Sequence, residues 1–136
     1  MSYLVDTNVL SEIRRRTPDR AVSRWFSALP TSLVHLSVLT LGEIGRGIAQ
    51  IRARDPRQAD SYQGWLDQVR STYRERIVIV DERICDAWAD LSARATLPVV
   101  DGLLMATAVC HGLTFVTQDV RHPLALGIPV LNPWEI

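Results

Sequence analysis

The sequence alternates short apolar segments with longer segments of helical periodicity, and this alternation restricts the possible folds more than any other feature. The apolar segments are YLVD at 3–6, LVHLSV at 33–38, IVIV at 77–80, FVTQD at 115–119 and PVLNP at 129–133. Strands joined through helices run parallel in one sheet, with helices on its faces. We therefore predict an α/β fold: a three-layer α/β/α sandwich around a short, mainly parallel sheet. Its length fits a single domain over residues 1–136.

The ends of the helical segments carry local signals. The predicted helices cover residues 8–15, 18–29, 40–53, 56–75, 84–95 and 99–111. Thr40 and Glu43 have the spacing of a capping box at a helix start, and Gly112 stands where a left-handed C-terminal cap is expected. Gly45 and Gly47 have the wrong spacing for a nucleotide-binding loop, so we expect them to permit close helix packing.

Composition narrows the class of protein. All 15 basic residues are arginine, and the absence of lysine argues against Schiff-base chemistry and a P-loop. The hydrophobic fraction of 47% predicts a folded core. No apolar run reaches the roughly 18 residues that a membrane span needs, and the start does not resemble a signal peptide. We expect a cytoplasmic protein in which Cys85 and Cys110 are buried thiols.

Four acidic residues fall where a parallel sheet gathers ligand-binding groups. Asp6 and Asp119 follow predicted strands, while Glu43 and Asp101 stand in the first turns of predicted helices. These positions share the carboxyl edge of the sheet, so the four carboxylates can converge there. Taken singly, Glu43 can complete the capping box and Asp101 can favour the positive end of a helix. A cluster of like charges is tolerated chiefly around a cation, and oxygen ligands favour Mg²⁺ or Mn²⁺ acting on a phosphodiester.

Four motifs in order resemble those of PIN-domain ribonucleases, above all the VapC and FitB toxins of type II toxin-antitoxin pairs. They are LVDTNVLSE at 4–12, LTLGEIGRG at 39–47, LPVVDGLLMATAVCHG at 97–112 and LTFVTQDVRHPLALGIPVLNPW at 113–134. The resemblance spans nearly the whole chain. It implies a PIN-like fold and an endoribonuclease that depends on Mg²⁺ or Mn²⁺. It also implies an RNA substrate, a small cognate antitoxin and a homodimer.

The resemblance carries the family's functional residues onto individual positions. Asp6, Glu43, Asp101 and Asp119 match the catalytic, metal-binding acids, of which Asp119 stands where relatives carry Asn or Asp. Two polar positions, Asn8 and Thr117, match residues that support the acids. The expected reaction uses water activated by the bound metal to attack the scissile phosphorus.

The chain departs from the family pattern just after the fourth acid. Relatives often continue with an acid and an aromatic residue where this chain has His122 and Pro123. We assign no catalytic role to His122, to His35, which we expect to be packed within a strand, or to His111, which fits a helix C-terminus.

Arginines and aromatic residues are the candidates for contacts outside the acids. RNA contacts are predicted for Arg14, Arg15, Arg16 and Arg46, which can equally be solvated or face an antitoxin acid. The helix over 56–75 presents Tyr62, Trp65 and Tyr73, which can form a dimer interface or close the monomer core. We expect all four tryptophans to pack rather than to stack on bases.

Two other functions stay open from the residues. One is a catalytically silent PIN-like domain that binds RNA or protein, because intact ligands do not prove turnover. The other is a phosphohydrolase with an aspartyl nucleophile at Asp6, although this enzyme would need a second acid where Asn8 stands and usually a lysine.

Overall fold

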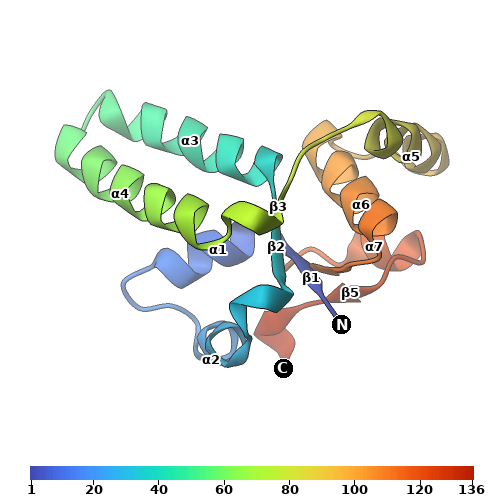
Figure 1. The fold of residues 1–136 in the computed structure, drawn as a ribbon, viewed down its shortest axis with the longest axis horizontal. Helices are drawn as coiled ribbons and strands as arrows, with labels where there is room; N and C mark the ends of the chain where they lie inside the picture. Colours follow the sequence, from blue (N-terminus) through green and yellow to red (C-terminus); the bar gives the residue numbers. More distant parts are fainter.

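Five short strands form the centre of the molecule, and every pair of neighbouring strands is parallel. The computed structural model describes residues 1–136 and orders the sheet as β3-β2-β1-β4-β5 (Figure 1). The strands are β1 (Tyr3–Val5), β2 (Val34–Ser37), β3 (Ile77–Val78), β4 (Thr114–Val116) and β5 (Val130–Leu131). The predicted fold class is confirmed, with a sheet that is entirely parallel.

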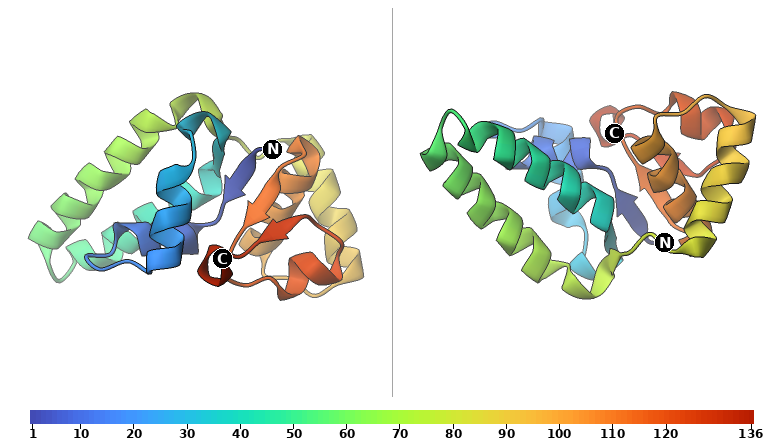
Figure 2. Two further views of the ribbon diagram at one scale, coloured as in Figure 1. Left: turned by 90° about the horizontal axis from the view of Figure 1, so that it is seen from below. Right: turned by 90° about the horizontal axis from the view of Figure 1, so that it is seen from above.

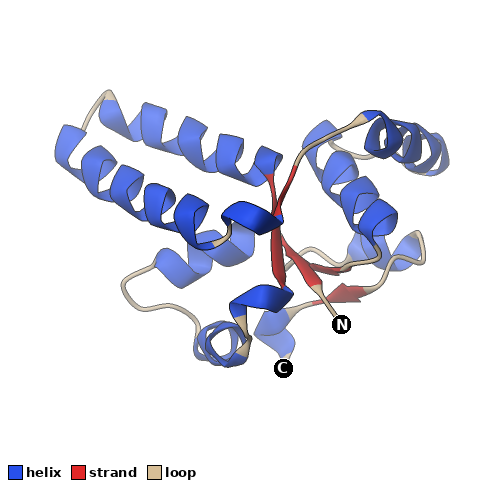
Figure 3. Cartoon of the chain, in the orientation of Figure 1, coloured by secondary structure: helices blue, strands red, loops and turns tan.

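Helices cover both faces of this sheet. On one side lie α1 (Thr7–Arg14), α2 (Arg20–Ala28), α3 (Val38–Arg52) and α4 (Pro56–Thr72); on the other lie α5 (Glu82–Arg94), α6 (Val99–His111) and the short α7 (Arg121–Ala125) (Figures 1 and 3). The α3–α4 and α5–α6 pairs stand apart on opposite sides of the strands (Figure 2). Three 3₁₀ turns cover Thr31–Leu33, Arg74–Arg76 and Pro133–Glu135.

Alternating side chains of the strands supply two separate cores. Val5 and Val116 face the core under α1 to α4, whereas Leu4 and Phe115 face the core under α5 and α6. A strand buried on both faces is apolar at every position, which is why these segments read as continuous apolar runs. Tyr73 is buried in the first core and Trp65 packs against it, so the residues predicted for either a dimer interface or the monomer core serve the core.

The third predicted strand is shorter than expected because the strand beside it ends early. The segment IVIV at 77–80 forms a strand only at Ile77 and Val78, which pair with Leu36 and Ser37 of β2. After Ser37 the chain turns directly into α3, so Ile79 has no strand beside it and is exposed.

The predicted capping box at Thr40 is wrong. Ser37 caps α3, since its hydroxyl oxygen accepts a hydrogen bond from the Leu39 N–H at 3.0 Å. Thr40 is fully buried inside the helix. The N-cap therefore lies three residues earlier than expected, at Ser37, and Glu43 lies in the second turn of the helix.

The structure confirms one prediction for the glycines and contradicts another, and it contradicts the prediction that both cysteines are buried. Gly112 is confirmed as the left-handed cap of α6, with φ of 62°. Gly45 and Gly47 do not serve close packing, because a Cβ atom at either position would meet nothing within 4 Å. The cysteines are not both buried: Cys85 is exposed, and Cys110 is half-buried.

No single helix is both long and apolar enough to cross a membrane. The α5–α6 pair reaches that length and composition only as two helices joined at a bend of 118°.

Candidate functional site

An acidic cleft lies where the order of the strands reverses. The chain places β2 and β3 on one side of β1, and β4 and β5 on the other. Ligands of open parallel sheets bind at such a reversal, beyond the carboxyl ends of the strands. The Asp6 N–H donates to the carbonyl oxygen of Val116 at 2.9 Å. This bond sets Asp6 and Thr117, the residues that leave β1 and β4, side by side.

Asp6 is held by hydrogen bonds to both carboxylate oxygens. Oδ1 accepts from the Thr7 N–H at 2.7 Å, and Oδ2 accepts from the Thr117 hydroxyl at 2.8 Å. The Asn8 amide in turn donates to Thr117 Oγ1 at 3.3 Å. The two predicted supporting residues thus form a chain that ends on Asp6.

Glu43 reaches the cleft from α3 and is held by a residue that the sequence interpretation missed. The Thr7 hydroxyl donates to Glu43 Oε1 at 2.6 Å, and Thr7 Oγ1 lies 3.2 Å from the Thr40 hydroxyl oxygen. Thr7 is the middle residue of DTN, so the motif itself contained the signal. Glu43 takes no part in capping the helix.

Asp101 enters from the first turn of α6, whose N-cap Pro98 provides no side-chain cap. The side chain is exposed at the cleft, but neighbouring atoms still desolvate it and raise its pKa; repulsion from Glu43 and then Asp119 raises the pKa further. A carboxylate that served only to favour the helix end would have a lowered pKa. The raised pKa therefore indicates that Asp101 is influenced by the other cleft carboxylates, and that it does more than stabilise the start of α6.

Burial has the largest effect on Asp6. It raises the pKa of this carboxyl from 3.8 to about 6, against the lowering effect of the hydrogen bonds from Thr117 and Thr7. The charges of Asp101 and Glu43 add to the rise. Three carboxylates on three separate elements therefore act on one another electrostatically, as their positions in the sequence predicted.

The cleft has a volume of about 580 Å³, and all but one of the residues that line it are polar or charged. Besides the three carboxylates and Asn8, it is lined by Thr7, Ser11, Glu12, Arg15, Gln118 and Trp134. Trp134 is the only hydrophobic residue among them and also packs against the core beneath α2. The prediction that Trp134 packs is thus confirmed, but its place at the cleft was missed.

Asp119 does not join the other three acids. It lines an adjoining hollow that shares Asn8 and Gln118 with the cleft. Its carboxylate is paired with Arg121, whose hydrogen bonds lower the pKa of Asp119. Asp119 therefore lies beside the cleft, paired with a cation on α7, while its charge still acts on Asp101. Its predicted place among the metal-binding acids stays a prediction.

The four predicted RNA-binding arginines take different positions. Arg14 lies over the Tyr62 ring, 3.6 Å from its centroid, and so faces α4. Arg15 lines the cleft and pairs with Glu12 at 3.2 Å. Arg16 and Arg46 are exposed and do not line the cleft.

The donor set of the cleft fits a hard divalent cation. The ion pairs of the molecule join Arg15–Glu12, Arg52–Asp60, Arg70–Asp67 and Arg121–Asp119, so the three cleft carboxylates have no cationic partner. The Asn8 carbonyl oxygen is buried there without a hydrogen-bond partner. As the side chains stand, no three acidic, histidine or cysteine residues lie close enough together to hold an ion by themselves. An ion would complete its shell with water, as Mg²⁺ commonly does.

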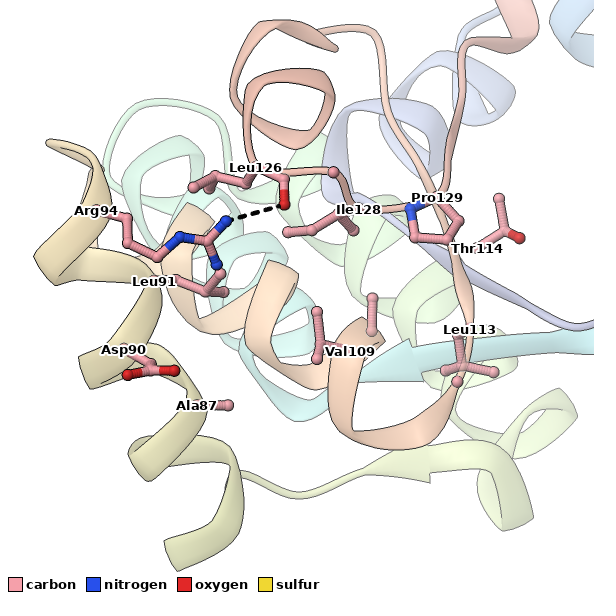
Figure 4. Close-up of a pocket in the computed structure, with 13 residues that line it drawn as sticks. Ala87, Asp90, Leu91, Arg94, Val109, Leu113, Thr114, Leu126, Ile128 and Pro129 are labelled. Atoms are coloured by element: carbon pink, nitrogen blue, oxygen red, sulfur yellow. Dashed lines mark hydrogen bonds between the residues drawn. The ribbon is translucent and has the colours of Figure 1, made fainter.

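A second hollow differs in both place and chemistry. It lies between α5, α6 and the loop after α7, at the amino ends of β4 and β5 (Figure 4). Its lining is mainly apolar, its volume is about 440 Å³, and Arg94 spans it to donate to the Leu126 carbonyl oxygen at 3.3 Å. It contains one carboxylate, Asp90, and thus no set of metal ligands.

None of the three histidines lines the cleft. His35 is half-buried in β2, where burial lowers its pKa, followed by the charge of Arg76. His111 ends α6 as predicted. The cleft chemistry therefore rests on carboxylates.

Comparisons with known proteins agree with this geometry. A sequence profile of the PIN domain matches residues 3–125. A VapC ribonuclease of Sinorhizobium fredii is 34% identical, and toxin FitB of Neisseria gonorrhoeae is 31% identical; the alignments cover 97% of this chain and 97% and 98% of the relatives. The crystal structure of FitAcB from Neisseria gonorrhoeae superimposes with a TM-score of 0.91 at 29% identity, over 98% of this chain and 99% of that one. A toxin-antitoxin complex from Klebsiella pneumoniae has a similar fold, with a TM-score of 0.74 at 23% identity over 99% and 100% of the two chains.

Proposed function

The chain belongs to the PIN-domain family, in the group of VapC and FitB toxins, and from this premise we propose that it is a divalent-metal-dependent endoribonuclease. One observation carries the proposal: Asp6, Glu43 and Asp101 share a cleft without a cationic partner. The ribonuclease named among its relatives supports RNA as the substrate.

Three residues would hold the ion, namely Asp6, Asp101 and Glu43, directly or through water. The ion would be Mg²⁺ or Mn²⁺, which when bound lowers the pKa of water and offsets the charge on phosphate oxygens. Thr7 orients two of the ligands, because its N–H binds Asp6 and its hydroxyl binds Glu43. Asn8 and Thr117 fix Asp6 from the other side. The site is thus pre-organised before RNA arrives.

The remaining assignments concern partners and setting. The likeness to toxin FitB and to the FitAcB structure supports a toxin of a toxin-antitoxin pair, with a small antitoxin as the partner. From the family resemblance, we propose that the protein is cytoplasmic, that residues 1–136 act as one domain and that the chain forms a homodimer.

Cleavage of a mixed cellular RNA pool tests the proposed function. We expect discrete cleavage with Mg²⁺ or Mn²⁺ that EDTA, Asp6→Asn and Asp101→Asn each abolish. Asp90→Asn is the matched control, because it removes an acid at the opposite edge of the sheet, and it should retain activity. Absence of cleavage by wild-type protein with Mn²⁺ bound would favour a silent binding domain instead.

A further inference from the structure

Arg121 lines the hollow that adjoins the acidic cleft and forms a two-bond ion pair with Asp119. Its Nε donates to Asp119 Oδ1 at 3.1 Å, and its Nη2 donates to Oδ2 at 3.2 Å. Both side chains are largely exposed, at 81% for Arg121 and 51% for Asp119. The guanidinium is therefore accessible to a ligand from solvent.

This position adjoins the cleft. Asn8 and Gln118 line both the cleft and the hollow that contains Arg121. The charge of Asp119 also reaches Asp101, whose pKa it raises. A group bound to Arg121 would thus lie next to the proposed ion site.

Charge and geometry together indicate what Arg121 can bind. A nucleic-acid backbone is repelled by the cleft carboxylates and needs a cation beside them. The two parallel N–H groups that grip a carboxylate also match two oxygens of a phosphodiester. An exposed ion pair contributes little stability, so a phosphate can replace the carboxylate.

The partner of Arg15 is held differently. Glu12 is buried, and it accepts from the Asp19 N–H at 2.9 Å as well as from Arg15. The Asp119 carboxylate is exposed, and its only backbone hydrogen bond, from the Arg121 N–H, is longer at 3.4 Å. Of the two arginines near the carboxylates, Arg121 has the more readily exchanged partner.

We propose that Arg121 binds an RNA phosphate next to the cleft by exchanging Asp119 for that phosphate, which frees the Asp119 carboxylate for the divalent ion. The exchange rests on the proposed function and adds to it a coupling between RNA binding and ion binding. RNA would tighten binding of the ion, and the ion would tighten binding of RNA by the same factor. Asp119 would then act as a ligand only when RNA is present.

Two titrations on the full chain test the exchange. The first measures the affinity of a labelled random-sequence RNA oligonucleotide in EDTA at several salt concentrations. We expect Arg121→Ala to weaken binding about tenfold and to reduce the salt slope by about 1. Arg74→Ala, at an exposed arginine before β3, is the matched control and should behave as wild type.

The second titration measures Mn²⁺ binding by calorimetry without RNA. We expect Arg121→Ala to bind Mn²⁺ severalfold more tightly, because Asp119 loses its competing cation, and Arg121→Ala combined with Asp119→Asn to lose that gain. Circular dichroism checks that each variant stays folded.

Several outcomes overturn the proposal. RNA affinity and salt slope that match those of Arg74→Ala would exclude Arg121 as the phosphate contact, as would a wild-type chain that binds no RNA. Unchanged Mn²⁺ affinity in Arg121→Ala would exclude the exchange. Failure of the proposed function has a different signature: Mn²⁺ binding unaffected by Asp6→Asn in the same titration.

Discussion

At the scale of single residues, Asp6 links the fold to the cleft chemistry. It ends β1, caps α1 and carries a carboxylate whose pKa burial raises from 3.8 to about 6. An acid with a raised pKa binds more protons in the folded than in the unfolded chain, so stability falls as pH rises between these two values. At neutral pH the free protein therefore holds a destabilising charge that a cation would offset.

Removing this charge should stabilise the free protein. We predict that Asp6→Asn raises the free energy of unfolding by about 1 to 3 kcal/mol at pH 7.5 in EDTA. Urea unfolding at several pH values checks this, because the gain should shrink from pH 6 toward pH 4. A variant less stable than wild type at pH 7.5 would show that the charge is already compensated.

Thr7 shows what a motif reveals and what it leaves hidden. The place of Asp6 at a strand end pointed to this acid, and the family resemblance added Asn8 and Thr117. Neither showed that Thr7 reaches Glu43, because that contact spans 36 residues and depends on where α3 starts.

Loss of the Thr7 hydroxyl should impair catalysis more than stability. We predict that Thr7→Val lowers RNA cleavage about tenfold, because Glu43 loses its orienting donor, and lowers stability by only about 1 kcal/mol. Thr7→Ser should restore cleavage, since it keeps the hydroxyl. Equal rates for the valine and serine variants would argue against an orienting role.

At the scale of elements, the length of a strand depends more on the strand it pairs with than on its own local sequence. The segment at 77–80 is apolar throughout, yet β3 stops at Val78 because β2 ends at Ser37. The short helix α7 was not predicted, because its five residues include Pro123 and show no periodicity. The order of strands and helices was predictable, whereas their ends depended on contacts between elements.

The α5–α6 contact should position Asp101. Gly102 lies against the Trp88 ring, where a Cβ atom would come within 3.0 Å of the indole. We predict that Gly102→Ala displaces the first turn of α6, costs about 1 to 3 kcal/mol and weakens Mn²⁺ binding. Thermal unfolding and calorimetry measure the two effects.

Gly47→Ala is the matched control for this substitution. Its Cβ atom would meet nothing within 4 Å in the interior of α3, so the higher helix propensity of alanine should add about 0.5 to 1 kcal/mol. If Gly102→Ala also stabilised the protein, Trp88 would not constrain the start of α6.

At the scale of the whole molecule, the sheet brings together residues that are remote in sequence. Asp6, Glu43 and Asp101 come from three elements and meet because all three leave the same edge of the sheet. This convergence followed from the parallel topology and could be predicted. The pairing of Asp119 with Arg121 could not be predicted, because it depends on the position that α7 gives to Arg121.

The raised pKa of Asp6 predicts how ion binding depends on pH. The ion binds the ionised carboxylate, so below about pH 6 it must displace a proton. We predict that Mn²⁺ affinity rises with pH through about 6 and levels off above pH 7, as calorimetry in buffers of different ionisation enthalpy can measure. An affinity that stays constant from pH 5 to 7.5 would mean that Asp6 is not a ligand.

The most direct test of the central claim is the position of Mn²⁺ in an anomalous difference map from crystals soaked with this ion. We predict a peak in the acidic cleft, with Asp6 or Asp101 oxygens about 2.1 Å from it and Glu43 linked directly or through water. A map with Mn²⁺ elsewhere, or with no ion in the cleft at a saturating concentration, would contradict the account.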